Sequence, residues 1–134
     1  APLEGRVTAV RRVPGTLFPV QPYMVRGLRG LFVRNERLVL RLETTLGPVA
    51  LVCVGATGVG TISLSLDTEE ITAQGKPVSK GDEVAAFNLG STVILILPPC
   101  GAALAGLEPG QEVRVGQVLA TVGAEPGVGE ENQA

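Results

Sequence analysis

The apolar residues of this chain fall in short runs that end at glycine or proline, which favours a fold built of short strands. Residues 49–54 (VALVCV) form one run and are followed by Gly55. Residues 93–97 (VILIL) form another, which ends at Pro98-Pro99. Runs of this length, rich in β-branched residues and bounded by turn formers, are typical of buried strands. The 18 glycines and 10 prolines also argue against long helices.

Alternation of apolar and polar residues predicts further strands. Residues 4–13, 38–42 and 61–66 alternate, and positions 38, 40 and 42 are expected in the core. Residues 75–84 and 112–122 are interpreted as hairpins, and residues 35–37 as a tight turn in which Arg34 pairs with Glu36. Residues 23–31 carry no clear pattern. With about eight short strands and almost no helical periodicity, the chain is expected to be all-β.

Composition excludes several classes of protein. The net charge of −2 gives no reason to expect a nucleic-acid partner. The chain has no histidine and no metal-ligand spacing, so no metal site is predicted. Cys53 and Cys100 lie in apolar surroundings, which favours buried thiols over a disulfide. No apolar run reaches the roughly 18 residues needed to span a bilayer, and no signal peptide opens the chain. One domain is expected over residues 1–122, with a disordered tail over residues 123–134.

The step from Gly90 to Ser91 is the candidate reactive site. Gly90 leaves the backbone free to bend and its carbonyl unhindered. Ser91 then stands at the start of a rigid strand with its hydroxyl beside that peptide bond. A Gly-Ser-Thr step is also an ordinary turn, so the surrounding sequence has to decide between the two interpretations.

That surrounding sequence resembles the phosphatidylserine decarboxylases. The LGST of residues 89–92, preceded by KGDEV at 80–84, is similar to the self-processing site of that family. VPGTLFPV at 13–20, LFVRNER at 31–37 and VGATGVG at 54–60 match other family segments. The resemblance covers about residues 1–122. It implies two packed antiparallel sheets of the barrel-sandwich type that biotinyl and lipoyl domains share.

The resemblance implies a chemistry for Gly90 and Ser91. Ser91 Oγ attacks the Gly90 carbonyl, the resulting ester breaks by β-elimination, and the dehydroalanine at position 91 hydrolyses to a pyruvoyl group and ammonia. This covalent pyruvoyl cofactor then serves a carboxy-lyase that converts phosphatidylserine to phosphatidylethanolamine in phospholipid biosynthesis. Backbone N–H groups of residues 55–60 are a hypothesis for the oxyanion donors. Substrate contacts are expected at Phe18, Pro19, Val20 and Thr57.

The family also implies partners and a location. The two fragments are expected to stay associated, a homodimer is possible, and the enzyme is expected as a peripheral protein at the cytoplasmic face of a membrane. Membrane contact is expected through an N-terminal part that this chain lacks. In the family an Asp and a His-x-x-His pair precede the segment that matches Ala1-Pro2. Without them, the chain as given is expected to fold but to be inactive alone.

Two other functions remain open on the sequence. One is a pyruvoyl-dependent decarboxylase of a soluble amino acid, although such families lack the VPGxLF and LFVRNER segments. The other is a non-catalytic β-sandwich that acts as a carrier or an interaction domain. A carrier needs a lysine at a hairpin tip, and Lys76 beside Pro77 is a weak candidate. A dinucleotide site at residues 55–60 is rejected, because a strand and not a helix is expected next.

Overall fold

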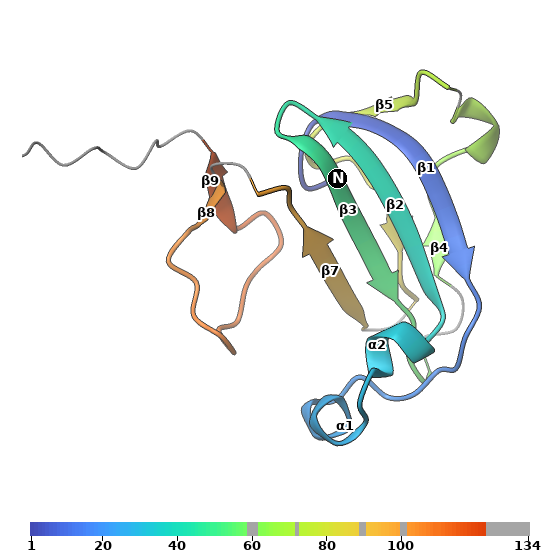
Figure 1. The fold of residues 1–134 in the computed structure, drawn as a ribbon, viewed down its shortest axis with the longest axis vertical. Helices are drawn as coiled ribbons and strands as arrows, with labels where there is room; N and C mark the ends of the chain where they lie inside the picture. Colours follow the sequence, from blue (N-terminus) through green and yellow to red (C-terminus); the bar gives the residue numbers. More distant parts are fainter. Residues whose placement is uncertain (59–61, 72, 89–90, 100–101, 123–134) are drawn as a thin grey trace, which may run out of the picture. The chain divides into compact units, whose positions relative to one another are not determined.

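The alternating residues at 38–42 lie at the centre of a five-stranded antiparallel sheet (Figure 1). The computed structural model describes residues 1–58, 62–71, 73–88, 91–99 and 102–122. The sheet has the order β5-β1-β2-β3-β7. Its strands are β1 (Gly5–Val13), β2 (Arg37–Thr44), β3 (Gly47–Val54), β5 (Lys76–Val78) and β7 (Thr92–Ile96). Leu38, Leu40 and Leu42 are buried, as the period of two predicts.

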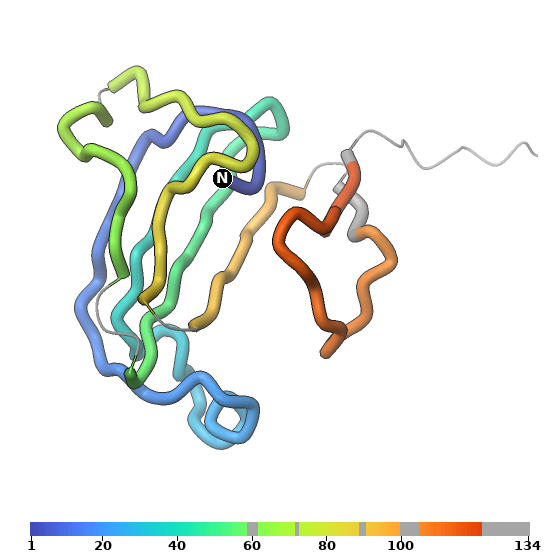
Figure 2. The backbone as a smooth tube through the Cα atoms, turned by 180° about the vertical axis from the view of Figure 1, so that it is seen from behind, coloured from blue at the N-terminus to red at the C-terminus, as the bar shows by residue number. Residues whose placement is uncertain are grey.

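A short two-stranded ribbon covers one face of this sheet. It pairs β4 (Ser63–Leu64) with β6 (Ala85–Ala86). Ile62 and Val84, which flank the ribbon, pack into the same core as Leu40 and Leu51 of the sheet. Figure 2 shows the segment from β4 to β6 lying over the sheet when the chain is seen from behind. The sheet and the ribbon therefore form two antiparallel layers around one apolar core.

Two short helices connect β1 to β2. They are α1 (Pro22–Gly27), which has a proline in its first turn, and α2 (Leu31–Arg34). A 3-10 turn, η1 (Thr68–Glu70), follows β4 and is capped by the Asp67 carboxylate, which accepts from Glu69 N at 2.9 Å. No helix in the part of the chain that the structure describes is long and apolar enough to cross a membrane.

The chain divides into two units, Ala1–Pro98 and Pro99–Ala134. The second contains β8 (Ala102–Leu104), paired antiparallel with β9 (Ala120–Val122). The single domain expected over residues 1–122 stays a prediction. The tail predicted over residues 123–134 lies outside the described residues.

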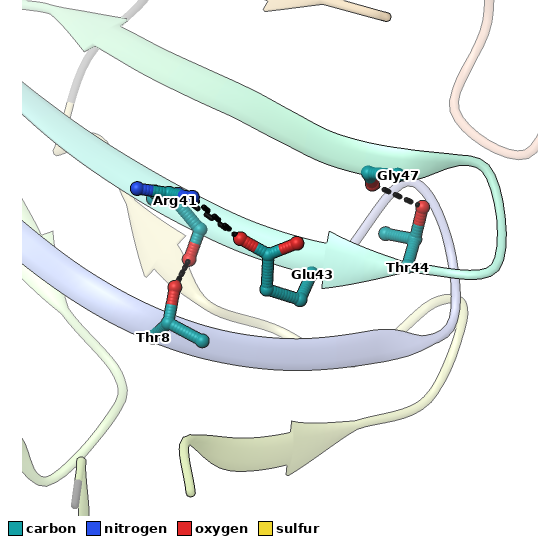
Figure 3. A network of polar contacts seen from close by, with 5 residues as sticks. All are labelled: Thr8, Arg41, Glu43, Thr44 and Gly47. Carbon is teal, nitrogen blue, oxygen red and sulfur yellow. Dashed lines mark hydrogen bonds and ion pairs between the residues drawn. The ribbon is translucent and has the colours of Figure 1, made fainter. Parts of the chain in front are cut away.

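A small polar network lies on β1, β2 and the turn between β2 and β3 (Figure 3). Thr8 lies where the β1–β2 register shifts, between Val7 and Ala9, and its hydroxyl donates to Arg41 O at 3.5 Å. The Arg41 guanidinium donates to Glu43 Oε1 at 2.7 Å. These groups are exposed, so solvent screens their interactions. The network connects β1 to β2 at the register shift and contributes little to the stability of the sheet.

The all-β prediction is confirmed, and the strands predicted at 4–13, 38–42 and 49–54 correspond to β1, β2 and β3. Part of residues 23–31, which carry no clear sequence pattern, is helical. Two hairpin predictions are wrong. Residues 75–84 are not a two-stranded hairpin, because β5 is the one strand described within them and it pairs with β1. Residues 112–122 are not a hairpin either, because β9 pairs with β8.

The strand at residues 93–97 is also less buried than expected. It forms β7, which pairs with β3 at the edge of the sheet. Val93 and Ile96 are 53% and 54% exposed. Leu95, which shares a face of the strand with Val93, packs against the core, whereas Ile96 lies on the opposite face. The run is therefore apolar on both faces, and its core-facing side is only partly covered within unit 1.

Candidate functional site

Ser91 is fixed at the point where β7 begins. Thr92 lies opposite Val54 in the β3–β7 ladder, and the Ser91 hydroxyl donates to the carbonyl oxygen of Val54. Val54 is fully buried and Ser91 is half-buried. The pairing of two strands thus places the hydroxyl at the end of β3, where the segment Gly55 to Gly58 starts. Leu89 and Gly90, which complete the motif, lie outside the described residues.

Asn35 is the buried polar residue that organises this end of the sheet. Its side chain is 0% exposed. Its Nδ2 donates to Gly55 O and to Phe18 O, both at 2.8 Å. Its Oδ1 accepts from Phe18 N at 3.0 Å and from the Thr16 hydroxyl at 3.1 Å. One amide therefore joins three chain segments, and its hydrogen-bonding groups are satisfied without solvent.

Two glycines permit the close approach of these segments. Thr16 N donates to Arg34 O at 2.9 Å, and Glu36 N donates to Thr16 O at 2.8 Å. A Cβ on Gly15 would lie 2.3 Å from Arg34 O. A Cβ on Gly55 would lie 3.3 Å from Glu36 O. The glycine of the VPG segment is therefore required because two backbones touch there.

The candidate substrate residues are attached to the same network. Phe18 is held by Asn35 through both of its backbone groups. The Thr57 hydroxyl donates to Leu17 O, so the 16–20 segment is tied to the segment after β3. Pro19 and Val20 follow Phe18 and are half-buried. The link from these residues to Ser91 runs through adjacent carbonyls, since Val54 O accepts from Ser91 and Gly55 O accepts from Asn35.

The charged groups differ from the sequence prediction. Glu36 pairs with Arg12 at 2.7 Å and not with Arg34. The Arg12 guanidinium also donates to Ile62 O at 2.6 Å. Arg34 lies with its guanidinium carbon 5.5 Å from the centre of the Phe18 ring, at cation–π distance. The expected Arg34–Glu36 pair is therefore wrong, because Arg34, at the end of α2, lies over Phe18 while Glu36, beyond the helix, faces Arg12 on β1.

One proposed oxyanion donor is already in use. The Gly55 N–H donates to Glu36 O at 2.8 Å and cannot serve a second acceptor well. Val59, Gly60 and Thr61 lie outside the described residues, so the hypothesis for the rest of this loop stays a prediction. Among the described residues, no group of three or more His, Cys, Asp or Glu side chains is placed to hold a metal ion.

Cys53, next to Val54 on β3, is a buried free thiol. Burial raises its pKa above the ordinary value of 9.0, because the thiolate would be poorly solvated. A neutral thiol is a poor nucleophile, so Cys53 acts as a small apolar core residue. Cys100 lies outside the described residues.

A cavity of about 820 Å³ lies at the other end of the sheet, beside the β2–β3 turn. Its lining includes Gly5, Thr44, Pro77 and Lys80, and none of the candidate substrate residues. Lys76, the candidate carrier lysine, lies within β5 and pairs with Glu70. A lysine that is paired inside a strand does not suit a carrier domain, which presents its lysine on an exposed turn.

Sequence reasoning missed Asn35, which it treated as a turn residue. The partners of Asn35 are 17 and 20 residues away in sequence, so no local pattern reveals its burial. The signal that was available is the match of LFVRNER to a family segment, which marks position 35 without assigning it a role.

Comparison with known proteins finds the same family that the sequence motifs resemble. The family model for phosphatidylserine decarboxylase matches residues 1–121. The chain is 48% identical over 132 residues to a phosphatidylserine decarboxylase proenzyme of Anaeromyxobacter sp. (strain K), covering 88% of this chain and 47% of that protein. It is 44% identical over 130 residues to the proenzyme of Halorhodospira halophila (strain DSM 244 / SL1), covering 89% and 44%.

The proenzyme of Acidovorax ebreus (strain TPSY) is 41% identical over 133 residues, which covers 89% of this chain and 47% of that protein. The chain thus spans about half the length of the curated relatives it matches. The match of nearly the whole chain to the family model, together with these identities, shows that the chain belongs to the phosphatidylserine decarboxylase family.

Proposed function

We propose that this chain is the core of a pyruvoyl-dependent enzyme that decarboxylates phosphatidylserine to phosphatidylethanolamine after self-cleavage between Gly90 and Ser91. The observation that carries the proposal is the position of Ser91. Its hydroxyl is fixed by a buried carbonyl at the start of a strand, in the motif that resembles the family's cleavage site. The two β layers would then belong to a barrel-sandwich of the biotinyl/lipoyl type.

The hydrogen bond to Val54 prepares Ser91 for attack on the preceding peptide bond. Because the hydroxyl donates to Val54 O, its rotamer is fixed while its oxygen lone pairs stay available. Attack by Oγ on the Gly90 carbonyl carbon converts the peptide bond to an ester. β-Elimination then releases residues 1–90 as a carboxylate, and water removes ammonia from residue 91. A carbonyl oxygen does not take the hydroxyl proton, so a separate base is required.

The residues of the site fit the cofactor that this cleavage would form. Ser91 is half-buried at the end of a rigid strand, so a group derived from it would be held without a free linker. The ketone of a pyruvoyl group draws electrons from the substrate carbon that loses carbon dioxide. Phe18, Pro19, Val20 and Thr57 are proposed to contact the substrate, with Asn35 holding Phe18 in place.

The strand pairing supports the proposal that the two fragments stay together. The upstream fragment would contain β3 and the downstream fragment would begin just before β7. Five residue pairs join these strands, from Ala50–Ile96 to Val54–Thr92. Cleavage between them would remove one covalent bond and leave this ladder in place. We further propose a peripheral location at the cytoplasmic face of a membrane and a homodimer.

Intact-mass analysis of the full-length protein tests the self-cleavage. The wild type is expected as two fragments, with the downstream one lighter by one ammonia than a fragment that begins with free serine. Ser91→Ala is expected to stay as one chain. Ser65→Ala, which removes another hydroxyl in the same unit, is expected to cleave normally. Cleavage of Ser91→Ala would refute the role of this hydroxyl.

A substrate assay tests the reaction separately. The cleaved protein is expected to release carbon dioxide from phosphatidylserine in detergent micelles and not from free serine. Release from free serine or another soluble amino acid would favour the alternative class of pyruvoyl decarboxylase. Failure of both assays, with normal folding, would favour a non-catalytic domain.

A further inference from the structure

We infer that residues 22–34, the α1–α2 lobe, form a docking surface for a bilayer that contains anionic phospholipid. The inference goes beyond the proposed reaction, because it requires no turnover. It concerns a segment of this chain that no sequence pattern marked as a membrane contact. Three independent observations carry it: the exposed apolar side chains of the lobe, its arginines, and its place beside the Ser91 end of the sheet.

The lobe exposes several large apolar side chains, whose contact with water is unfavourable. No residue of α1 is buried. Tyr23 is 64% exposed and Val33 is 70% exposed. Val25 of α1 and Leu17, just before the lobe, are also exposed. A tyrosine among exposed aliphatic residues is the composition that segments at a membrane interface use.

The charge around the lobe selects an anionic surface. Residues 22–34 contain three arginines, Arg26, Arg29 and Arg34, and no acidic residue. The other 121 residues carry eight basic and thirteen acidic side chains. Within the described parts of the chain, neither Arg26 nor Arg29 has an ion-pair partner. A basic and apolar face on an otherwise acidic protein is complementary to anionic lipid headgroups.

The lobe lies at the end of the sheet that holds the candidate site. Figures 1 and 2 both show α1 and α2 beyond the end of β3 and the start of β7. Asn35 follows α2 directly and is bonded to Gly55, the residue after Val54. Arg34 of the lobe lies over the Phe18 ring. Docking through the lobe would therefore bring the Ser91 end of the sheet to the lipid surface, where a lipid substrate resides.

Vesicle binding of the 134-residue chain tests the docking. The vesicles are phosphatidylcholine alone, or phosphatidylcholine with phosphatidylglycerol, which is anionic but is not the proposed substrate. We expect binding to the mixed vesicles and little to phosphatidylcholine alone. Since an arginine near an anionic surface changes binding about fivefold, Arg26→Gln/Arg29→Gln should weaken it roughly 25-fold. Arg41→Gln/Arg114→Gln, with the same change in net charge, should weaken it less than about twofold.

Fluorescence locates the contact on the chain. The sequence has no tryptophan, so a single tryptophan reports one position. Tyr23→Trp should be quenched by brominated acyl chains in the mixed vesicles. Val115→Trp, at a fully exposed position of the other unit, should not be quenched. Quenching at 115 and not at 23, or equal losses in the two double-arginine variants, would overturn the inference.

Binding to phosphatidylserine vesicles but not to phosphatidylglycerol vesicles would also overturn it, because that result indicates recognition of one headgroup. The proposed activity is measured in detergent micelles, where no bilayer is present. A protein that decarboxylates normally but does not bind vesicles would refute the docking surface alone. A protein that binds vesicles but does not decarboxylate would refute the proposed function alone.

Discussion

The side chain of Asn35 donates a 2.8 Å hydrogen bond to the carbonyl oxygen of Gly55, the residue next to the one that holds Ser91. This contact connects the end of β3 to the segment that carries Phe18. The position of the candidate substrate residues relative to the candidate nucleophile therefore depends on one buried amide.

Replacing Asn35 with alanine is expected to lower the free energy of unfolding by about 2–4 kcal/mol. The change leaves the Phe18 N–H, Phe18 O and Gly55 O without their buried partner, at about 1–3 kcal/mol for each unsatisfied group before relaxation. Urea unfolding measures the difference. Thr8→Ala is the control, because its hydroxyl bond is long and exposed, and a change within about 0.5 kcal/mol is expected. Equal effects of the two variants would contradict the role assigned to Asn35.

Replacing Gly15 with alanine is expected to destabilise the protein by more than about 2 kcal/mol, because the new Cβ would overlap backbone atoms that cannot move independently. Gly27→Ala is the matched change. A Cβ there has no neighbour within 4 Å, and alanine reduces the freedom of the unfolded chain, so a gain of up to about 1 kcal/mol is expected. Thermal unfolding of both variants decides, and a stable Gly15→Ala protein would contradict the close approach described above.

Stability is expected to fall at alkaline pH through Cys53. Its pKa is raised in the folded protein, so folding disfavours the thiolate. The contribution is fully present below the ordinary pKa of 9.0 and is lost as pH rises above it. The difference in unfolding free energy between wild type and Cys53→Ala, measured from neutral pH upward, should shrink above that value. A difference that stays constant would show that the thiol titrates equally in both states.

The two fragments of the cleaved protein are expected to co-elute in native buffer and to separate in denaturant, if the proposed cleavage occurs. Leu95→Asp should release the downstream fragment, because it introduces a charge where Leu95 packs against the core. Ile96→Asp, at the next residue on the opposite and exposed face of β7, should leave the fragments together. Size-exclusion chromatography of each variant makes the comparison. Release by both variants would indicate that the ladder alone, without core packing, holds the fragments.

Sequence patterns predicted the central strands well, because the alternation at Leu38, Leu40 and Leu42 reflects a sheet with one buried face. The sequence patterns did not predict the exposure of β7. An apolar run shows that its residues can be buried, but it does not show whether the strand lies at the edge of the sheet. Val93 and Ile96 are half-exposed for that reason. They also missed α1, since six residues starting at Pro22 are too few to establish a helical period.

The candidate site was predictable only in part. Ser91 was found from its motif, and its place at the start of β7 follows from the apolar run after it. The contacts that hold the site could not be predicted, because each joins residues far apart in sequence. Thr57 and Leu17, for example, are 40 positions apart. Which strand pairs with which decides these contacts, and local patterns carry little information on pairing.

The Ser91 hydroxyl is oriented by a carbonyl 37 residues earlier in the chain. An unfolded or misregistered chain does not bring these two residues together, and a shift of β7 by one residue would turn the pleat over. The proposed cleavage would therefore take place only in molecules in which β3 and β7 are correctly paired. Molecules that failed to pair β3 with β7 would remain intact precursors, and enzyme activity would appear only in copies that had already reached the native topology.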